Sequence, residues 1–143
     1  MSKTAIIYWS GTGNTEAMAN AILKGAKEQN SDTAYFTVSE ISASDAAAYD
    51  TLILGCPAMG AEVLEEEEFE PFFTELESKL SGKNVALFGS YGWGDGEWMR
   101  LWEERTKNAG ASLIGGEGLM LNEMPDSEGL SLCEEFGKAA ASI

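Results

Sequence analysis

Histidine is absent from the sequence, and this absence excludes several classes of chemistry at once. Without an imidazole the chain cannot build a serine–histidine catalytic triad, a histidine-ligated metal site or a phosphohistidine intermediate. Cysteine is scarce, because Cys56 and Cys133 are far apart in the sequence and form no CxxC pair. We therefore expect neither a zinc site nor a dithiol redox centre, and the default environment is the reducing cytoplasm.

Positive charge is also scarce. The 143 residues include 9 Lys and Arg against 24 Asp and Glu, which gives a formal net charge of −15. Such a chain repels nucleic acid phosphates and anionic membranes and attracts basic protein surfaces. Long apolar runs are missing, since none approaches the ~20 residues of a transmembrane helix, and the N-terminus lacks the features of a signal peptide. We expect a cytoplasmic protein that binds no nucleic acid and no membrane.

The rest of the composition is that of a folded protein. Hydrophobic residues make up 44% of the chain and charged residues 23%, which is typical of globular and not of disordered sequences. A chain of 143 residues is the size of one ordinary domain and needs no disulfide or metal to be stable. We expect residues 1–143 to form a single domain.

Short apolar runs and helical patterns alternate five times along the chain. The runs predicted as strands are 5–8, 34–38, 52–55, 85–89 and an edge strand over 113–121 that Gly115 and Gly116 interrupt. The predicted helices cover about 15–29, 46–48, 69–80, 98–108 and 130–140. Strands that are apolar on both faces belong to a parallel sheet with helices on each side, so the pattern predicts a doubly wound α/β fold.

This topology brings three loops together. Every loop that follows a strand emerges at the carboxyl edge of a parallel sheet, which is the edge where such sheets bind ligands. We therefore expect the loops over 10–15, 56–62 and 90–96 to be neighbours in space.

The first loop has the residues of a phosphate site. The segment Ser10-Gly11-Thr12-Gly13-Asn14-Thr15 lies between a strand and a helix. Its glycines allow several N–H groups to converge, and the helix N-terminus adds partial positive charge. Neither the lysine of a P-loop nor the third glycine of a dinucleotide fingerprint is present. The alternative interpretation is a helix cap in which glycine serves only packing.

The second and third loops offer side chains suited to a flat ring. Met59 precedes Gly60 in the second loop, and Trp93 stands between two glycines in the third. A tryptophan framed in this way should be exposed, and an exposed tryptophan at a site edge is usually a stacking surface. The alternatives are an ordinary turn with Met59 in the core and a surface Trp93 for a protein partner. Together, a phosphate site, a methionine and a tryptophan favour flavin mononucleotide (FMN) over a nucleoside triphosphate.

These segments closely resemble a known family. Residues 8–15, 55–60 and 87–96 are similar in sequence, order and spacing to the loops of short-chain flavodoxins of the clostridial type, and the resemblance spans essentially the whole chain. It implies a flavodoxin-like, five-stranded parallel sheet with strand order 2-1-3-4-5 and helices on both faces. Pro57 and Ala61 depart from the clostridial pattern, in which serine and aspartate are usual.

The resemblance also assigns roles to residues. Residues 10–15 would hold the FMN 5′-phosphate, Met59 would flank the inner face of the isoalloxazine ring, and Trp93 would flank the outer face. The backbone of 59–62 and 90–94 would hydrogen-bond the polar edge of the ring, with Glu62 at N3–H. The expected FMN-binding residues are Ser10, Gly11, Thr12, Gly13, Asn14, Thr15, Ala58, Met59, Gly60, Ala61, Glu62, Ser90, Tyr91, Gly92, Trp93 and Gly94.

The implied function is electron transfer without catalysis. The family resemblance implies a low-potential, one-electron carrier whose non-covalently bound FMN shuttles between semiquinone and hydroquinone. The acidic charge indicates partners with basic surfaces, namely reductases and low-potential acceptors, and we expect a monomer. Six glutamates between Glu62 and Glu70 allow two interpretations, a solvated helix start or a docking face for such partners.

Two other functions remain open at this stage. A small FMN-dependent quinone or NAD(P)H oxidoreductase could use the same fold, although Trp93 is expected to cover the ring face that a substrate needs. A phosphate-binding signalling domain would need paired acidic residues after the first strand, where Trp9 and Ser10 stand instead.

Overall fold

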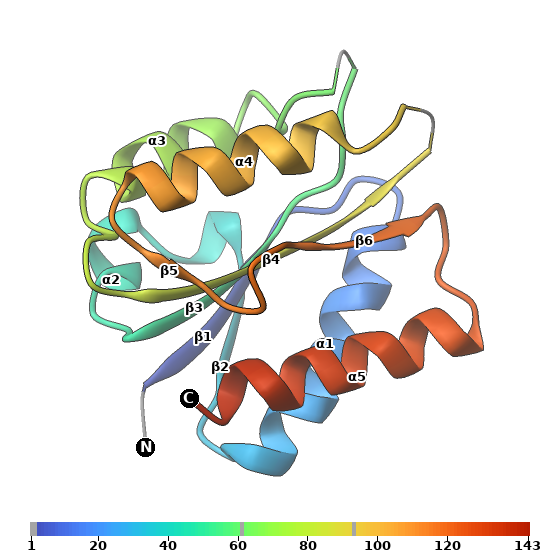
Figure 1. Cartoon of the computed structure of the whole chain (residues 1–143), viewed down its shortest axis with the longest axis horizontal. Helices are drawn as coiled ribbons and strands as arrows, with labels where there is room; N and C mark the ends of the chain where they lie inside the picture. The colour runs from blue at the N-terminus through green and yellow to red at the C-terminus, as the bar shows by residue number, and fades with distance from the viewer. Residues whose placement is uncertain (1–2, 61, 93) are drawn as a thin grey trace.

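The chain folds around one parallel sheet, shown in Figure 1. The computed structural model describes residues 3–60, 62–92 and 94–143. Its strands are β1 (Thr4–Tyr8), β2 (Ala34–Thr37), β3 (Thr51–Gly55), β4 (Asn84–Tyr91), β5 (Ser112–Leu113) and β6 (Leu119–Asn122). They lie in the order β2-β1-β3-β4-β5, and β6 also pairs with β4. This confirms the predicted doubly wound sheet and its strand order.

The fifth strand of the sheet is divided into two pieces. Both β5 and β6 pair in parallel with β4, β5 at its beginning and β6 at its end. Gly115 and Gly116, between them, have φ angles of 78° and 80°, which glycine adopts without steric penalty. The interrupted edge strand predicted from the sequence is therefore confirmed, and the interruption explains why six strands are counted where five were expected.

Helices cover both faces of the sheet (Figure 1). One face carries α1 (Asn14–Gln29) and α5 (Ser127–Ala141), and the other carries α2 (Ala43–Ala46), α3 (Phe69–Glu77) and α4 (Glu97–Asn108). A short 3₁₀ helix, η1 (Val38–Glu40), follows β2. Within the described residues, no helix is both long and apolar enough to cross a membrane.

Two boundaries differ from those predicted. The short helix α2 covers 43–46 and not 46–48, because the Ser42 hydroxyl accepts the Asp45 N–H at 3.0 Å and fixes its start. Strand β4 runs to Tyr91, so Ser90 and Tyr91 belong to the strand and not to the third loop. The register with β6 explains this extension, since Ser90 pairs with Leu121 and Tyr91 with Asn122.

The core consists of two apolar clusters, one on each face of the sheet. Every residue of β1 and β3 is buried, as expected for strands covered on both sides. The α1–α5 pair packs closely, because a Cβ on Gly137 would clash with the backbone of Ile22. This packing anchors α1, and the N-terminus of α1 begins the functional site.

Candidate functional site

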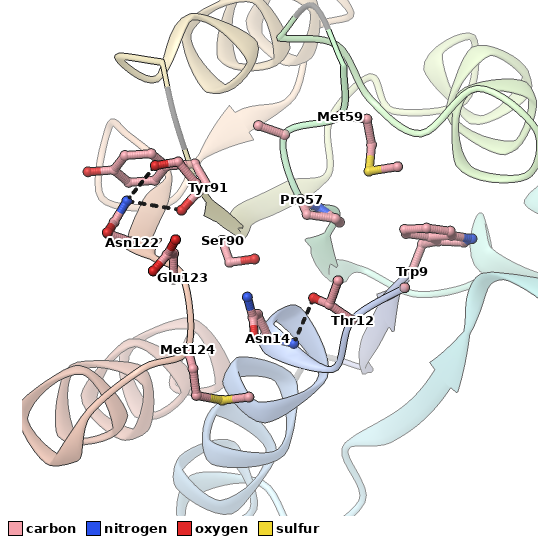
Figure 2. A pocket seen from close by; sticks show the side chains of 13 residues that line it. Trp9, Thr12, Asn14, Pro57, Met59, Ser90, Tyr91, Asn122, Glu123 and Met124 are labelled. Carbon is pink, nitrogen blue, oxygen red and sulfur yellow. Dashed lines mark hydrogen bonds between the residues drawn. The ribbon is translucent and has the colours of Figure 1, made fainter.

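A cavity of about 650 Å³ opens at the carboxyl edge of the sheet (Figure 2). The three predicted loops meet there, and a fourth segment, 122–124, joins them after β6. Its lining residues are Trp9, Gly11, Thr12, Asn14, Pro57, Ala58, Met59, Ser90, Tyr91, Gly92, Asn122, Glu123 and Met124. The prediction that the loops after β1, β3 and β4 are neighbours is therefore confirmed.

The predicted site residues fall into several groups. Eight of them line this cavity: Gly11, Thr12, Asn14, Ala58, Met59, Ser90, Tyr91 and Gly92. Ser10 and Gly13 line a smaller hollow of about 260 Å³ that shares Trp9 and Gly11 with the cavity. Thr15 is buried, Gly60 is exposed at a turn, and Glu62 lies against Gly94. Ala61 and Trp93 lie outside the described residues, so the predicted exposure of Trp93 stays a prediction.

The first loop presents unused hydrogen-bond donors. The Ser10 hydroxyl oxygen accepts the N–H groups of Gly13 and Glu16, each at 3.2 Å, and so closes the loop onto the start of α1. Gly13, the N-cap residue, has φ of 97°. Across the described part of the chain, the N–H groups of Gly11, Thr12 and Thr15 find no acceptor. Convergent free N–H groups at a helix N-terminus form an anion site.

Thr15 ties the first loop to β4. Its hydroxyl lies 3.1 Å from the Ser90 hydroxyl, and it accepts the Ser90 N–H at 3.4 Å. Thr15 is buried, whereas Ser90 lines the cavity and points into it (Figure 2). The contact therefore fixes two walls of the cavity relative to each other.

The second loop forms a closed turn. Met59 and Val63 exchange two backbone hydrogen bonds of 2.9 and 3.0 Å. The closure therefore extends one residue beyond the second loop expected over 56–62. Gly60 has φ of 45° and Glu62 has φ of 60°, so a glutamate adopts a left-handed conformation that such residues rarely occupy.

The Glu62 carboxylate is buried between the second and third loops. Its Oε2 accepts the N–H of Trp98 at 2.9 Å, near the start of α4. Within the described residues Oε1 is buried and has no hydrogen-bond partner. A Cβ on Gly94 would clash with this Oε1, so the third loop needs glycine there. A buried acceptor without a donor is costly. Glu62 is not among the residues that line the cavity, and it lines a neighbouring hollow of about 290 Å³.

The fourth segment was not among the predicted site residues. The Asn122 side-chain amide donates to the carbonyl oxygens of Tyr91 and Gly92, at 3.1 and 3.0 Å (Figure 2). The Glu123 N–H donates to the Tyr91 carbonyl at 2.7 Å, and Glu123 has φ of 54°. The signal that could have identified the segment is topological, because it too follows a strand at the carboxyl edge of the sheet.

Most of the acidic run between Glu62 and Glu70 has intramolecular partners. Burial would raise the pKa of Glu65, but N–H groups of residues 67–69, each 2.8 Å from its carboxylate, lower that pKa below its ordinary value. Glu70 pairs with Arg105 at 2.8 Å, and Glu68 accepts the indole N–H of Trp9. Four of the six carboxylates thus contact α3, α4 or the first loop, and Glu66, Glu67 and Glu68 are exposed.

The lining of the cavity carries little charge. Among the described lining residues there is no lysine or arginine, and Glu123 is the one carboxylate. The same residues contain no cluster of acidic or cysteine side chains suited to a metal ion.

Both cysteines are free and buried. Burial raises the pKa of each thiol, that of Cys133 to about 12. Neither thiol is therefore available as a nucleophile.

Comparison with known proteins identifies this architecture. The sequence model of the flavodoxin family matches residues 6–137. The chain belongs to the flavodoxin family. The flavodoxin of Megasphaera elsdenii is 52% identical to it, over an alignment that covers 95% of this chain and 96% of that protein. The flavodoxin of Clostridium beijerinckii is also 52% identical, over an alignment that covers 96% of this chain and 99% of that protein. The solution structure of two-electron reduced Megasphaera elsdenii flavodoxin is similar with a TM-score of 0.87 and 50% identity, covering 98% of this chain and 99% of that one.

Family membership decides between the functions left open by the sequence. The chain is a flavodoxin of the short-chain clostridial type, an FMN-binding electron carrier and not an enzyme, which exchanges electrons with reductases and acceptors. The oxidoreductase and signalling alternatives are not favoured. The described residues fit FMN: free N–H donors suit its phosphate, and the unpartnered Glu62 Oε1 suits a ring N–H.

Proposed function

We propose that this flavodoxin binds FMN in the cavity with the 5′-phosphate on residues 10–15. The observation that supports this placement best is the set of free N–H groups of Gly11, Thr12 and Thr15 in the first loop. N–H donors at a helix N-terminus stabilise an anion without any cationic side chain. Ser10 and Gly13 would act by shaping the loop, and Asn14 would add a side-chain donor.

The ring would lie between the second and third loops. Met59, whose side chain lies beside the cavity in Figure 2, would flank its inner face and Trp93 its outer face. Glu62 would accept the ring N3–H through its free Oε1. The remaining residues would contribute mainly backbone contacts to the polar edge of the ring: Ala58, Gly60, Ala61, Ser90, Tyr91, Gly92 and Gly94.

Bound FMN supplies one-electron chemistry, and the chain sets the potential at which it occurs. A buried Glu62 carboxylate and a net charge of −15 oppose further negative charge in the cavity. Two like charges ~8 Å apart repel by about 2 kcal/mol at an effective dielectric constant of ~20, equivalent to ~90 mV for one electron. We therefore propose that the carrier works at low potential.

The same charge supports a proposal about partners. Basic-surfaced reductases and acceptors would be attracted to a chain with 24 acidic residues against 9 basic ones. We propose that residues 1–143 act as one FMN-binding domain and as a monomer. A cytoplasmic location agrees with the two free, buried thiols.

Titration of the apoprotein with FMN and with riboflavin tests the placement of the phosphate. Riboflavin has the ring and the ribityl chain but no phosphate. We expect FMN to bind at least ~100-fold more tightly, because charge-assisted hydrogen bonds contribute about 1.5–3 kcal/mol each. Equal dissociation constants for the two flavins would contradict the placement of the phosphate on residues 10–15.

A further inference from the structure

Trp9 lies against the first loop and makes a long-range hydrogen bond. Its indole Nε1–H donates to Glu68 Oε1 at 3.1 Å, across 59 residues of sequence. A Cβ placed on Gly11 would lie 2.9 Å from Cη2 and 3.2 Å from Cζ3 of Trp9. The indole therefore packs directly on the backbone of Gly11, and Figure 2 shows it at the edge of the cavity beside Thr12.

The backbone of Glu68 is fixed at the start of α3, and its exposed side chain reaches the indole. Glu68 is the N-cap residue of α3 but makes no side-chain cap hydrogen bond. Instead the Glu65 carboxylate accepts the Glu68 N–H at 2.8 Å and the Phe69 N–H at 2.8 Å. Because Glu65 performs the capping, the side chain of Glu68 is free to reach Trp9.

The backbone of Trp9 is fixed separately. Its N–H donates to the Gly55 carbonyl at 3.0 Å, which continues the pairing of β1 with β3. Among the described residues, the Glu68 carboxylate is the acceptor of the indole N–H. Loss of this acceptor would leave the Trp9 backbone in place but would free its side chain to rotate away from Gly11.

We propose that Glu68 is a positioning residue for the FMN phosphate: it holds Trp9 against Gly11 and thereby keeps the N–H groups of the first loop in their binding arrangement. Glu68 lies outside the lining of the larger cavity, and it lines the adjoining hollow of about 260 Å³ together with Trp9 and Gly11. Its carboxylate is bonded to the Trp9 indole, so we infer that it acts on the first loop through Trp9. The inference rests on the proposed placement of the phosphate on residues 10–15.

Charge alone predicts the opposite effect. A carboxylate near a phosphate site repels the bound dianion, so removal of the Glu68 charge would strengthen FMN binding if Glu68 had no positioning role. Glutamine keeps an oxygen acceptor without the charge, whereas leucine removes both. The pair Glu68→Gln and Glu68→Leu therefore separates the two effects.

The test measures the dissociation constants of FMN and of riboflavin for five apoproteins. They are the parent, the single variants Glu68→Gln, Glu68→Leu and Trp9→Phe, and the double variant Trp9→Phe/Glu68→Leu. For Glu68→Leu we expect FMN to bind about fivefold more weakly, the effect of one lost hydrogen bond, with riboflavin binding changed less than about twofold. Glu68→Gln should bind FMN as tightly as the parent or more tightly. The double variant should bind FMN no more weakly than Trp9→Phe alone, because both changes break one contact.

Glu67 provides the matched control. It is the neighbouring residue and is exposed, so Glu67→Leu removes the same charge without touching Trp9. Unchanged FMN binding by Glu68→Leu, or an equal loss for FMN and riboflavin, would overturn the positioning role. If Glu68→Leu does not fold, the FMN-to-riboflavin ratio of Trp9→Phe decides, and an unchanged ratio overturns the proposal. A parent protein that binds both flavins equally would instead contradict the phosphate placement itself.

Discussion

Glu62 combines a left-handed backbone, a buried side chain and one carboxylate oxygen without a described partner. Each of these is unfavourable alone. Glu62 lines a hollow of about 290 Å³ next to α4 and not the FMN cavity itself, and we propose that bound FMN supplies the missing donor. Glu62→Gln retains an oxygen for the Trp98 N–H but replaces the free acceptor with an NH₂ group. We expect FMN to bind about fivefold more weakly and the second midpoint potential to rise by tens of millivolts, because a negative charge is lost.

FMN titration and anaerobic potentiometry measure both effects. Glu67→Gln is the control, since it removes an exposed charge close in sequence. An unchanged affinity together with an unchanged second potential would show that Glu62 does not meet the ring.

Gly60 is constrained by its backbone angle and not by space. Its φ is 45°, and no atom lies within 4 Å of the position that a Cβ would occupy. We hypothesise that the peptide after Gly60 reorients when FMN is reduced and presents the Gly60 carbonyl to the ring N5–H. Such a turn requires a positive φ at residue 60. This conformation costs alanine ~1 kcal/mol or more relative to glycine.

Gly60→Ala should therefore lower the first midpoint potential by roughly 40 mV or more. Because φ is already positive in this structure, alanine will also strain the turn before reduction, and only the difference between redox states changes the potential. Potentiometry of the two one-electron steps provides the measurement. Two unchanged potentials would mean that residue 60 is strained equally in every redox state, which contradicts the hypothesis that reduction places a new demand on its backbone.

At the scale of elements, the sequence predicted what local pattern and topology determine. The continuous apolar runs of β1 and β3 identified central strands, and the order of the strands brought residues 10–15, 58–59 and 90–92 to one edge. The prediction from sequence failed where a residue far away in the chain determines the local structure. β4 extends to Tyr91 only because β6 pairs with it, and the glutamates between 62 and 70 take partners as remote as Trp9 and Arg105.

The end of β6 supports the third loop through Asn122. Its amide bridges the carbonyl oxygens of Tyr91 and Gly92, so Asn122→Ala removes two hydrogen bonds from the segment that leads to Trp93. We expect a loss of about 1–2 kcal/mol in the free energy of unfolding and weaker FMN binding. Urea unfolding and FMN titration measure these, with the exposed Asn108→Ala as control. A variant with parental affinity would show that the bridge does not shape the site.

The start of α3 makes stability depend on pH through Glu65. Its three N–H donors outweigh the effect of burial, so the pKa in the folded protein lies below the ordinary value. A carboxyl group with a lowered pKa stabilises the fold above its unfolded pKa of about 4.3, and this contribution disappears as the pH falls through the folded value. Glu65→Gln should lower the free energy of unfolding at pH ~7 more than at pH ~3, measured by urea unfolding. An equal loss at both pH values would contradict this role of its charge.

At the scale of the whole molecule, the net charge of −15 determines how the carrier meets its partners. The structure restricts the docking interpretation of the acidic run. Glu66, Glu67 and Glu68 are its exposed members, but Glu68 is bonded to Trp9, and Glu62, Glu65 and Glu70 also have intramolecular partners. Steering by charge depends on ionic strength, because the screening length falls from ~30 Å at ~0.01 M to ~8 Å at ~0.15 M salt. We therefore expect electron transfer to a basic acceptor to slow steeply as salt rises.

Stopped-flow oxidation of the reduced holoprotein by cytochrome c, a basic redox protein, measures this dependence. Glu67→Lys and Asp32→Lys change the net charge equally, but Asp32 is exposed in the turn between α1 and β2, at the opposite edge of the sheet from the cavity. If the acidic run is part of the docking face, Glu67→Lys should slow the low-salt reaction several-fold more than Asp32→Lys, and the difference should vanish at high salt. Equal slowing by both variants would show that net charge acts without a local face, and a rate constant that does not change with salt would exclude charge-steered docking altogether.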